Sequence, residues 1–299
     1  MHDQKVRNLV RGAYDLQELR IETGNRLIAN FRTKLGIEPD EEATAGADEL
    51  MEALETEHTR LTDGVAQITA RYSFDFNGII SDYVELRMVD RYVNLVNEER
   101  RTFRDIKRAL EGIPIWEEFL EGVDGVGPAM GGCIVSELDP HKAPYPSSFW
   151  SYCGLDVVDG EGRSRKEEHL ETVEYVNSDG ETDTRKSLGY NPFAKTKMMG
   201  VLGPSLLKAG SAYRDHYDRY RHRKETDPDW AGASDGHLHQ ASLRYMVKQF
   251  LISLHMKWRD LEGLAVSRPY HAAKQGKTRH VSEREKQLGI ENPKRFDDE

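Results

Sequence analysis

Cysteine is scarce in this 299-residue sequence, which has two residues of that type, Cys133 and Cys153. Two cysteines are too few for the disulfide framework of a small secreted protein, and their spacing is not that of a zinc knuckle. We therefore expect both to be buried free thiols. The sequence predicts no metal site and no cofactor held by this chain.

Long apolar runs are also missing. No stretch approaches the roughly 20 consecutive apolar residues that a membrane-spanning helix needs. Residues 1–15 lack the apolar centre of a secretory signal. The sequence therefore favours a cytoplasmic protein with no membrane partner.

Composition limits the architecture. Hydrophobic residues make up 37% of the chain and charged residues 31%. This is a globular composition, but it is too polar for one large core. We therefore expect two or three packed units.

The formal net charge of −10 argues against a nucleic-acid partner, because neutralisation of phosphates supplies much of the affinity in such complexes. The charge is unevenly distributed, however. Residues 185–224 hold ten Lys or Arg and two Asp, a balance of +8, whereas residues 37–60 hold nine acids and one Arg, a balance of −8. The basic segment can therefore bind a polyanion, whereas the acidic segment would repel it. The alternative is that both are solvated helix faces.

Residues 1–112 read as three long helices. Apolar residues recur at three-and-four spacing in residues 3–35, in residues 47–72 and in a third helix that ends at Gly112. In the second helix they alternate strictly by four and three, which is the seam of a coiled coil, and His58 lies in that seam. We interpret His58 as fixing the register, with a pH switch as the alternative. The sequence predicts an antiparallel helical or coiled-coil arm that dimerises the protein and carries no chemistry of its own.

Shorter elements, glycines and aromatic residues follow the arm, and the predicted fold class is mostly α. We expect a helix-hairpin-helix module at residues 113–158 and then a small helical domain at residues 159–270. This domain should contain a β-hairpin insertion near residues 167–187 and a last strong helix at residues 237–260. A polar tail follows at residues 271–299. We expect the tail to be disordered.

The sharpest local signal runs from Gly122 to Pro128, where two short helices are joined by Gly125-Val126-Gly127. We expect the first of these glycines to adopt a positive φ, the second to allow close approach of another backbone, and the valine to anchor the turn in the core. The amides that follow would bind a DNA phosphate at a helix N-terminus without reading bases. We predict that Gly122 and the three turn residues belong to a DNA-binding helix-hairpin-helix; the alternative is a plain glycine-rich connection.

Further motifs follow in order, and the sequence resembles the insertion-sequence one-hundred-and-ten family of transposases, which are RNA-guided recombinases. In that family a carboxylate domain precedes a serine-bearing transposase domain. The resemblance spans nearly the whole chain. It rests on Gly122-Val-Asp-Gly-Val-Gly-Pro-Ala, Glu137-Leu-Asp-Pro, Ser148-Phe-Trp-Ser-Tyr-Cys-Gly-Leu155, Gly189-Tyr-Asn-Pro-Phe-Ala-Lys195 and Ala241-Ser-Leu-Arg-Tyr-Met-Val-Lys-Gln-Phe-Leu251.

The resemblance implies DNA transposition, with DNA and a guide RNA as partners, and two departures qualify it. No strand-rich stretch corresponds to the carboxylate domain, so Mg²⁺ is expected only through a partner domain acting in trans. The short Ser-Gly segment expected after Leu155 is replaced by residues 159–166 and the hairpin insertion.

Ser164 is the serine whose position is family-like, and Arg163, Arg165 and Lys166 flank it. In the chemistry that the resemblance implies, a hydroxyl attacks a phosphodiester, a phosphoserine holds the cut end, and cations stabilise the charge on phosphorus. We predict Ser164 as the catalytic nucleophile, with Ser187 second. The alternative is an exposed loop serine.

The remaining candidate residues are cations that would contact DNA phosphates. Beside the three that flank Ser164, the predicted contacts are Lys195, Lys197, Arg219, Arg221 and Arg223. Tyrosines at 213, 217 and 220 are interleaved with them, at a spacing that equally suits a helix core. The leading hypothesis is a DNA transposase or recombinase; the alternatives are a non-catalytic DNA-binding or assembly protein and, third, a coiled-coil scaffold.

Overall fold

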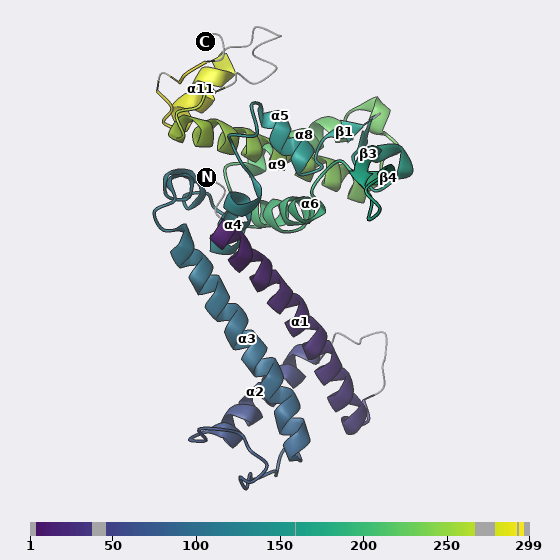
Figure 1. Ribbon diagram of the computed structural model, residues 1–299, viewed down its shortest axis with the longest axis vertical. Coiled ribbons are helices and arrows are strands. Elements are labelled where there is room, and N and C mark those ends of the chain that lie inside the picture. The colour runs from purple at the N-terminus through teal and green to yellow at the C-terminus, as the bar shows by residue number, and fades with distance from the viewer. Residues whose placement is uncertain (1–3, 38–45, 159, 267–278, 292, 296–299) are drawn as a thin grey trace. The chain divides into compact units, whose positions relative to one another are not determined.

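The computed structural model describes residues 4–37, 46–158, 160–266, 279–291 and 293–295 (Figure 1). It is mostly helical, with 63% helix and 7% strand, which confirms the predicted fold class. The chain divides into two compact units, one formed by Asn8–Ile106 and the other by Met1–Arg7 with Lys107–Glu299. Among the described residues, no helix is both long enough and apolar enough to cross a membrane.

The first unit contains α2 (Ala47–Thr62) and most of two longer helices, α1 (Gln4–Leu35) and α3 (Tyr83–Leu110). Helices α1 and α3 run antiparallel (Figure 1), since Lys34 near the end of α1 pairs with Glu85 near the start of α3 at 2.6 Å, and Arg20 pairs with Glu99 further along. Apolar side chains from all three helices and the loop before α3 form the core: Leu27, Phe31, Leu50, Leu54, Leu61, Ile80, Leu86, Val89 and Tyr92.

The predicted second helix is ten residues too long. Helix α2 ends at Thr62, and Gly64 follows with a φ of 70°, a left-handed conformation that terminates helices. The heptad pattern to Tyr72 therefore does not continue as a coiled-coil seam. Ile68 instead packs against the core from an irregular segment, while Tyr72 is exposed.

His58 faces a carboxylate inside the three-helix unit. Its Nε2 lies 3.2 Å from Asp90 Oδ1 of α3, and Arg87 donates to the other oxygen of Asp90 at 2.8 Å. His58 and Asp90 are both buried. A buried polar pair between α2 and α3 is the kind of contact that fixes the register of two packed helices.

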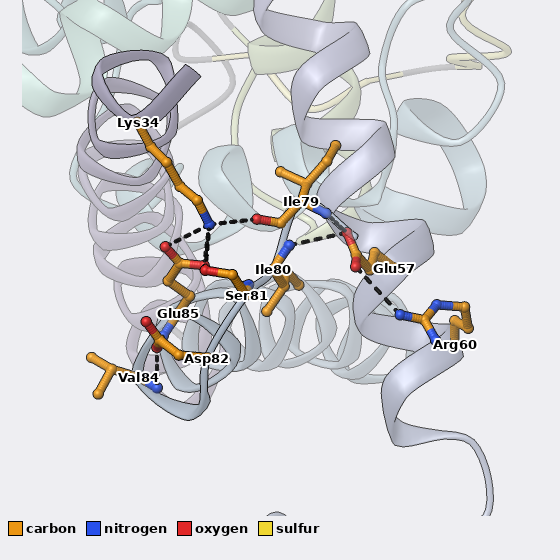
Figure 2. Close-up of polar contacts among 9 residues, drawn as sticks. All are labelled: Lys34, Glu57, Arg60, Ile79, Ile80, Ser81, Asp82, Val84 and Glu85. Carbon is orange, nitrogen blue, oxygen red and sulfur yellow. Dashed lines mark hydrogen bonds and ion pairs between the residues drawn. The ribbon is translucent and has the colours of Figure 1, made fainter. Parts of the chain in front are cut away.

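The segment before α3 is held by the carboxylate of Glu57, which is 8% exposed (Figure 2). Its Oε2 accepts the backbone N–H groups of Ile79 and Ile80 at 2.7 and 3.1 Å. Gly78 lies against this carboxylate so closely that a Cβ there would come within 1.8 Å of Oε1. One buried carboxylate thus satisfies two backbone amides, of which that of Ile80 is buried.

Replacing Glu57 with Ala is expected to lower the free energy of unfolding by about 3 kcal/mol, because two amides lose an anionic acceptor. Glu57→Gln keeps one acceptor oxygen, so we expect about half that loss. Urea unfolding of both variants measures this, with the exposed Glu52→Ala on the same helix as control. Equal losses in all three variants would contradict the role given to Glu57.

The second unit consists of short elements arranged around one long helix. They are η1 (Trp116–Leu120), α4 (Pro128–Glu137), α5 (Pro146–Tyr152), β1 (Val157–Val158), β2 (Glu161–Gly162), η2 (Glu167–His169), β3 (Leu170–Val176), β4 (Thr182–Leu188), α6 (Pro192–Lys197), η3 (Met198–Leu202), α7 (Gly203–Lys208), α8 (Arg214–Glu225), η4 (Pro228–Trp230), α9 (Asp235–Leu261) and α11 (Arg279–Gln287).

Helix α9 is the centre of this unit, and α5, α7 and α8 pack against it. The stripe predicted for its buried face is confirmed, since each of its members is at most 7% exposed: Leu243, Val247, Phe250, Leu254 and Trp258. From Phe250 to Arg259 every side chain is buried, so this half of α9 is surrounded by protein.

The β-hairpin prediction is confirmed. Strands β3 and β4 pair antiparallel from Leu170↔Leu188 to Val176↔Thr182, around a turn that includes Gly180 at a φ of 82°. Cys133 and Cys153 are buried thiols that are not joined by a disulfide, as expected.

The predicted disorder of residues 271–299 is wrong for α11. Ile290, which follows this helix, is 5% exposed and packs with Ile252 and Met256 of α9, and Arg284 donates to Gln249 at 2.8 Å. Burial of these few side chains explains order in a segment of polar composition. Residues 271–278 lie outside the described residues.

His255 lies in the C-terminal half of α9 and has no exposed surface. Its Nε2 is 2.8 Å from the carbonyl oxygen of Ala143, and its Nδ1 is buried with no hydrogen-bond partner. Burial lowers the pKa of His255 to about 4. Since the imidazole keeps its ordinary pKa of 6.5 when the chain unfolds, the unfolded state binds an extra proton between these two values.

The free energy of unfolding should therefore fall as the pH falls from 7 to 4, with about 3 kcal/mol of that loss due to His255. His255→Gln keeps an N–H donor for Ala143 and does not titrate. Between pH 7 and 4 the unfolding free energy of this variant should therefore fall by about 3 kcal/mol less than that of the wild-type protein. Urea unfolding of both proteins at pH 7, 6, 5 and 4 tests this. Parallel curves would show that His255 does not titrate in this window.

Candidate active site

The Gly125-Val126-Gly127 turn is held against α7. Gly125 has a φ of 93°, and a Cβ there would lie 2.8 Å from the carbonyl oxygen of Ser205, whose hydroxyl donates to the Gly125 carbonyl at 2.8 Å. The close backbone approach expected at Gly127 therefore occurs at Gly125. The approaching backbone is that of the protein itself. Val126 is 7% exposed, which confirms its anchoring role.

Gly127 is the residue of this turn that remains open. It has an extended conformation, with φ −88° and ψ 173°, and a Cβ there would have no atom within 4 Å. Pro128 is the first residue of α4, as expected. Gly122 is exposed, and a Cβ there would make one ordinary contact at 3.7 Å. The predicted phosphate contact at the start of α4 thus has space at Gly127.

Ser164 follows β2 and lies next to a histidine that the sequence did not single out. Its Oγ is 2.9 Å from Nδ1 of His169, and its backbone N–H donates to the same nitrogen at 2.9 Å. Because the amide can only donate, Nδ1 is the unprotonated nitrogen, and the Ser164 hydroxyl is oriented as a second donor to it. His169 is 4% exposed. This is the geometry of a hydroxyl nucleophile with a proton acceptor.

Acidic residues approach the same histidine. Ligand atoms of Glu161, Glu168 and His169 lie within 4.8 Å of one another, and these residue types bind divalent cations. Lys166 pairs with both carboxylates, however, at 3.7 Å from Glu168 and more closely to Glu161. A lysine of the same loop thus offsets one of the two negative charges and occupies the space between the carboxylates.

Arg163 is held inside the site by two carboxylates. Its Nε donates to both oxygens of Asp156, and its Nη1 pairs with Glu171 at 2.9 Å. Its own carbonyl accepts a hydrogen bond from Nζ of Lys195 on α6. The structure therefore brings Lys195 to the residue before Ser164, across 32 positions of sequence.

Two further cations of α9 reach this region, and the sequence analysis missed them. The guanidinium of Arg244 lies against Gly162, where a Cβ would come within 2.4 Å of Cζ and both terminal nitrogens. Lys248 is four residues further along, and its Nζ is 5.1 Å from the centre of the Trp150 ring. The sequence signal that could have identified them is their spacing by four, which places two cations on the same face of a helix.

The other predicted phosphate contacts lie on α6 and α8. Arg219 pairs with Asp215, and Arg221 contacts Glu225 and Asp235, so their charges are balanced locally. Arg223 is exposed and lies over the rings of Tyr220 and Tyr245 at 4.9 and 5.8 Å. Lys197 lies over Phe193, and Arg165 is exposed beside Ser164.

The interleaved tyrosines pack α8 onto α9. Tyr217 is 6% exposed with its hydroxyl 2.8 Å from Nδ1 of His239, and Tyr220 stacks on Tyr245 with ring centres 4.5 Å apart. Ser187, the second candidate nucleophile, lies opposite Glu171 in the hairpin register. Of the two candidate nucleophiles, Ser164 is therefore the one that the described structure places against a histidine.

Comparison with known protein families, characterised proteins and solved structures finds no match to this chain.

Gly125→Ala is expected to destabilise the second unit by about 3 kcal/mol, because a Cβ meets backbone atoms and the φ is strained. Gly127→Val should change stability by less than about 0.5 kcal/mol, since its extended backbone and open surroundings accept a side chain. If the start of α4 contacts a phosphate, Gly127→Val should nonetheless weaken DNA binding. Urea unfolding and fluorescence anisotropy with duplex DNA measure the two effects. Unchanged DNA affinity in Gly127→Val would exclude this turn as a DNA contact.

Proposed function

We propose that this protein binds DNA and acts in DNA transposition or recombination, with Ser164 as the nucleophile. The observation that carries the proposal is the 2.9 Å contact between Ser164 Oγ and Nδ1 of the buried His169. A serine hydroxyl is a weak nucleophile until a neighbouring base accepts its proton. The cations Lys195, Arg244 and Lys248 near the same loop supply the charge that phosphoryl transfer requires.

The proposed reaction exchanges one phosphate ester for another. Oγ of Ser164 forms a bond to phosphorus while the bond from phosphorus to one DNA oxygen breaks. The hydroxyl proton passes to Nδ1 of His169, and the imidazolium then returns a proton to the departing strand end, which leaves as a hydroxyl. Attack of a second strand's hydroxyl on the phosphoserine would release the protein with a new DNA junction, so the exchange needs no external energy source.

Several partners accompany this proposal. DNA is the substrate, and a guide RNA is proposed as a second nucleic acid. A carboxylate domain of another chain would supply Mg²⁺ in trans. The helical arm, residues 1–112, is proposed to join two copies of the chain, and the proposed location is the cytoplasm.

A non-catalytic DNA-binding or assembly role is the second candidate, and one observation favours it. Oγ of Ser164 also accepts the backbone N–H of Lys166 at 3.3 Å, so the serine and His169 together close a tight loop. Such contacts can be purely structural. The two candidates differ in whether a covalent protein–DNA complex forms.

Incubation with supercoiled and branched DNA, followed by denaturing electrophoresis, separates the candidates. The wild-type protein and Ser187→Ala should form a covalent adduct with DNA, whereas Ser164→Ala should lose at least about 99% of it, because the attacking oxygen is removed. Urea unfolding of Ser164→Ala serves as control for loop stability.

Reactions with and without co-purifying RNA, and with added Mg²⁺, extend this test to the proposed partners. An adduct that persists in Ser164→Ala would remove Ser164 as nucleophile. Salt-sensitive DNA binding with no adduct under any of these conditions would leave the assembly role.

A further inference from the structure

Three cations from two helices gather beside the loop that carries Ser164. Lys195 belongs to α6, and its Nζ donates to the carbonyl of Arg163. Arg244 and Lys248 belong to α9, and the guanidinium of Arg244 lies against the backbone of Gly162. Lys195 and Arg244 therefore converge on the stretch of chain that immediately precedes the serine, and Lys248, one helical turn from Arg244, interacts electrostatically with Arg244 and with Asp156.

The charge of this cluster exceeds that of its counterions. Asp156 is the carboxylate that acts on all three cations, and Arg163 already engages both of its oxygens. Burial, with repulsion from Arg244, lowers the pKa of Lys195 and of Lys248, and burial lowers the pKa of Arg244 itself. The cluster is thus held together without local neutralisation.

Hydrogen-bonding capacity is also unused here. Nε of Arg244 is buried and has no hydrogen-bond partner, and the same is true of Nε1 of Trp150, whose ring lies under Lys248. The ring of Tyr190 lies 4.7 Å from Nζ of Lys195. Aromatic faces hold ammonium groups in place without neutralising them.

Such an arrangement is unfavourable by itself. Like charges four residues apart destabilise a helix, and a buried guanidinium nitrogen without an acceptor is unfavourable as well. A bound phosphate offsets the repulsion, because it supplies negative charge and acceptor oxygens to the ammonium groups and the terminal guanidinium nitrogens.

We propose that Lys195, Arg244 and Lys248 form a binding site for a phosphate group. That this phosphate is a DNA phosphodiester held for Ser164 rests on the function proposed above; a free phosphate ion has the same chemistry. Arg244 is the central residue, since it interacts electrostatically with both lysines and its guanidinium lies against Gly162.

The first experiment measures thermal unfolding of the full chain in sodium phosphate and in sodium chloride of equal ionic strength. Phosphate at about ten times its Kd should raise the midpoint by about 3 °C. Phosphate also stabilises proteins generally by exclusion from their surface. The specific part is therefore the difference between the wild-type protein and Arg244→Gln or Lys248→Gln.

The second experiment measures binding of a 20-base-pair duplex by fluorescence anisotropy across a range of salt concentrations. Arg244→Gln and Lys248→Gln should each weaken binding about tenfold at low salt and reduce the slope of log K against log salt by about one. Lys142→Gln is the control, because it removes one positive charge from a side chain that is 81% exposed and pairs with Asp139.

The outcomes separate the two sources of phosphate. If the α9 variants lose both the stabilisation by phosphate and affinity for DNA, the site binds a DNA phosphate. If they lose only the stabilisation by phosphate, the site binds a free phosphate ion. If neither variant differs from Lys142→Gln in either experiment, the proposal is overturned. Should Arg244→Gln fail to fold by circular dichroism, Lys248→Gln decides alone.

Failure of this site is distinguishable from failure of the proposed function. Ser164→Ala should keep the response to phosphate while losing the covalent adduct. A wild-type protein that forms no adduct but responds to phosphate through Arg244 would contradict the catalytic function and leave the phosphate site standing.

Discussion

The burial of α9 is the constraint on which the second unit depends. One face carries the apolar stripe from Leu243 to Trp258, and α5, α7 and α8 pack around it. Fully burying each large apolar side chain contributes about 1.5–3 kcal/mol, so this one helix supplies much of the stability of the unit. Because α9 cannot rotate without exposing that stripe, the side chains that flank the stripe are fixed as well. Arg244 and Lys248 are two of them.

The candidate active site follows from this constraint. The guanidinium of Arg244 lies against Gly162, and the chain then turns through Ser164 to His169. Lys195 reaches the same loop from α6. The proposed nucleophile and its proposed proton acceptor thus belong to one short loop, whereas the cations come from helices distant in sequence. In this arrangement the helices carry the positive charge, and the loop carries the hydroxyl proposed to react.

Local patterns predicted the elements well. The apolar period of α9 and the turn residues of the β3–β4 hairpin gave the correct structures, since both depend on residues close in sequence. The second helix of the arm was wrong past Thr62, because a heptad pattern does not register the left-handed turn at Gly64 or the tertiary burial of Ile68. Burial of Ile290 on α9 likewise ordered a segment whose composition is polar.

The site was predictable only in part. Ser164 was chosen for its flanking cations, yet Arg163 and Lys166 pair with carboxylates of the same region. The contact with His169 was missed, although it spans five residues, because it depends on the conformation of one loop. Packing of Gly125 on Ser205, 80 positions away, has no local signal at all.

The central claim is that the Ser164 hydroxyl carries the chemistry of this protein. The most direct measurement digests the covalent protein–DNA complex with nuclease and protease and locates the remaining nucleotide by mass spectrometry. The account predicts a nucleotide joined through phosphate to Ser164, in the peptide between Arg163 and Arg165. A nucleotide on Ser187, or on any residue other than Ser164, would contradict it.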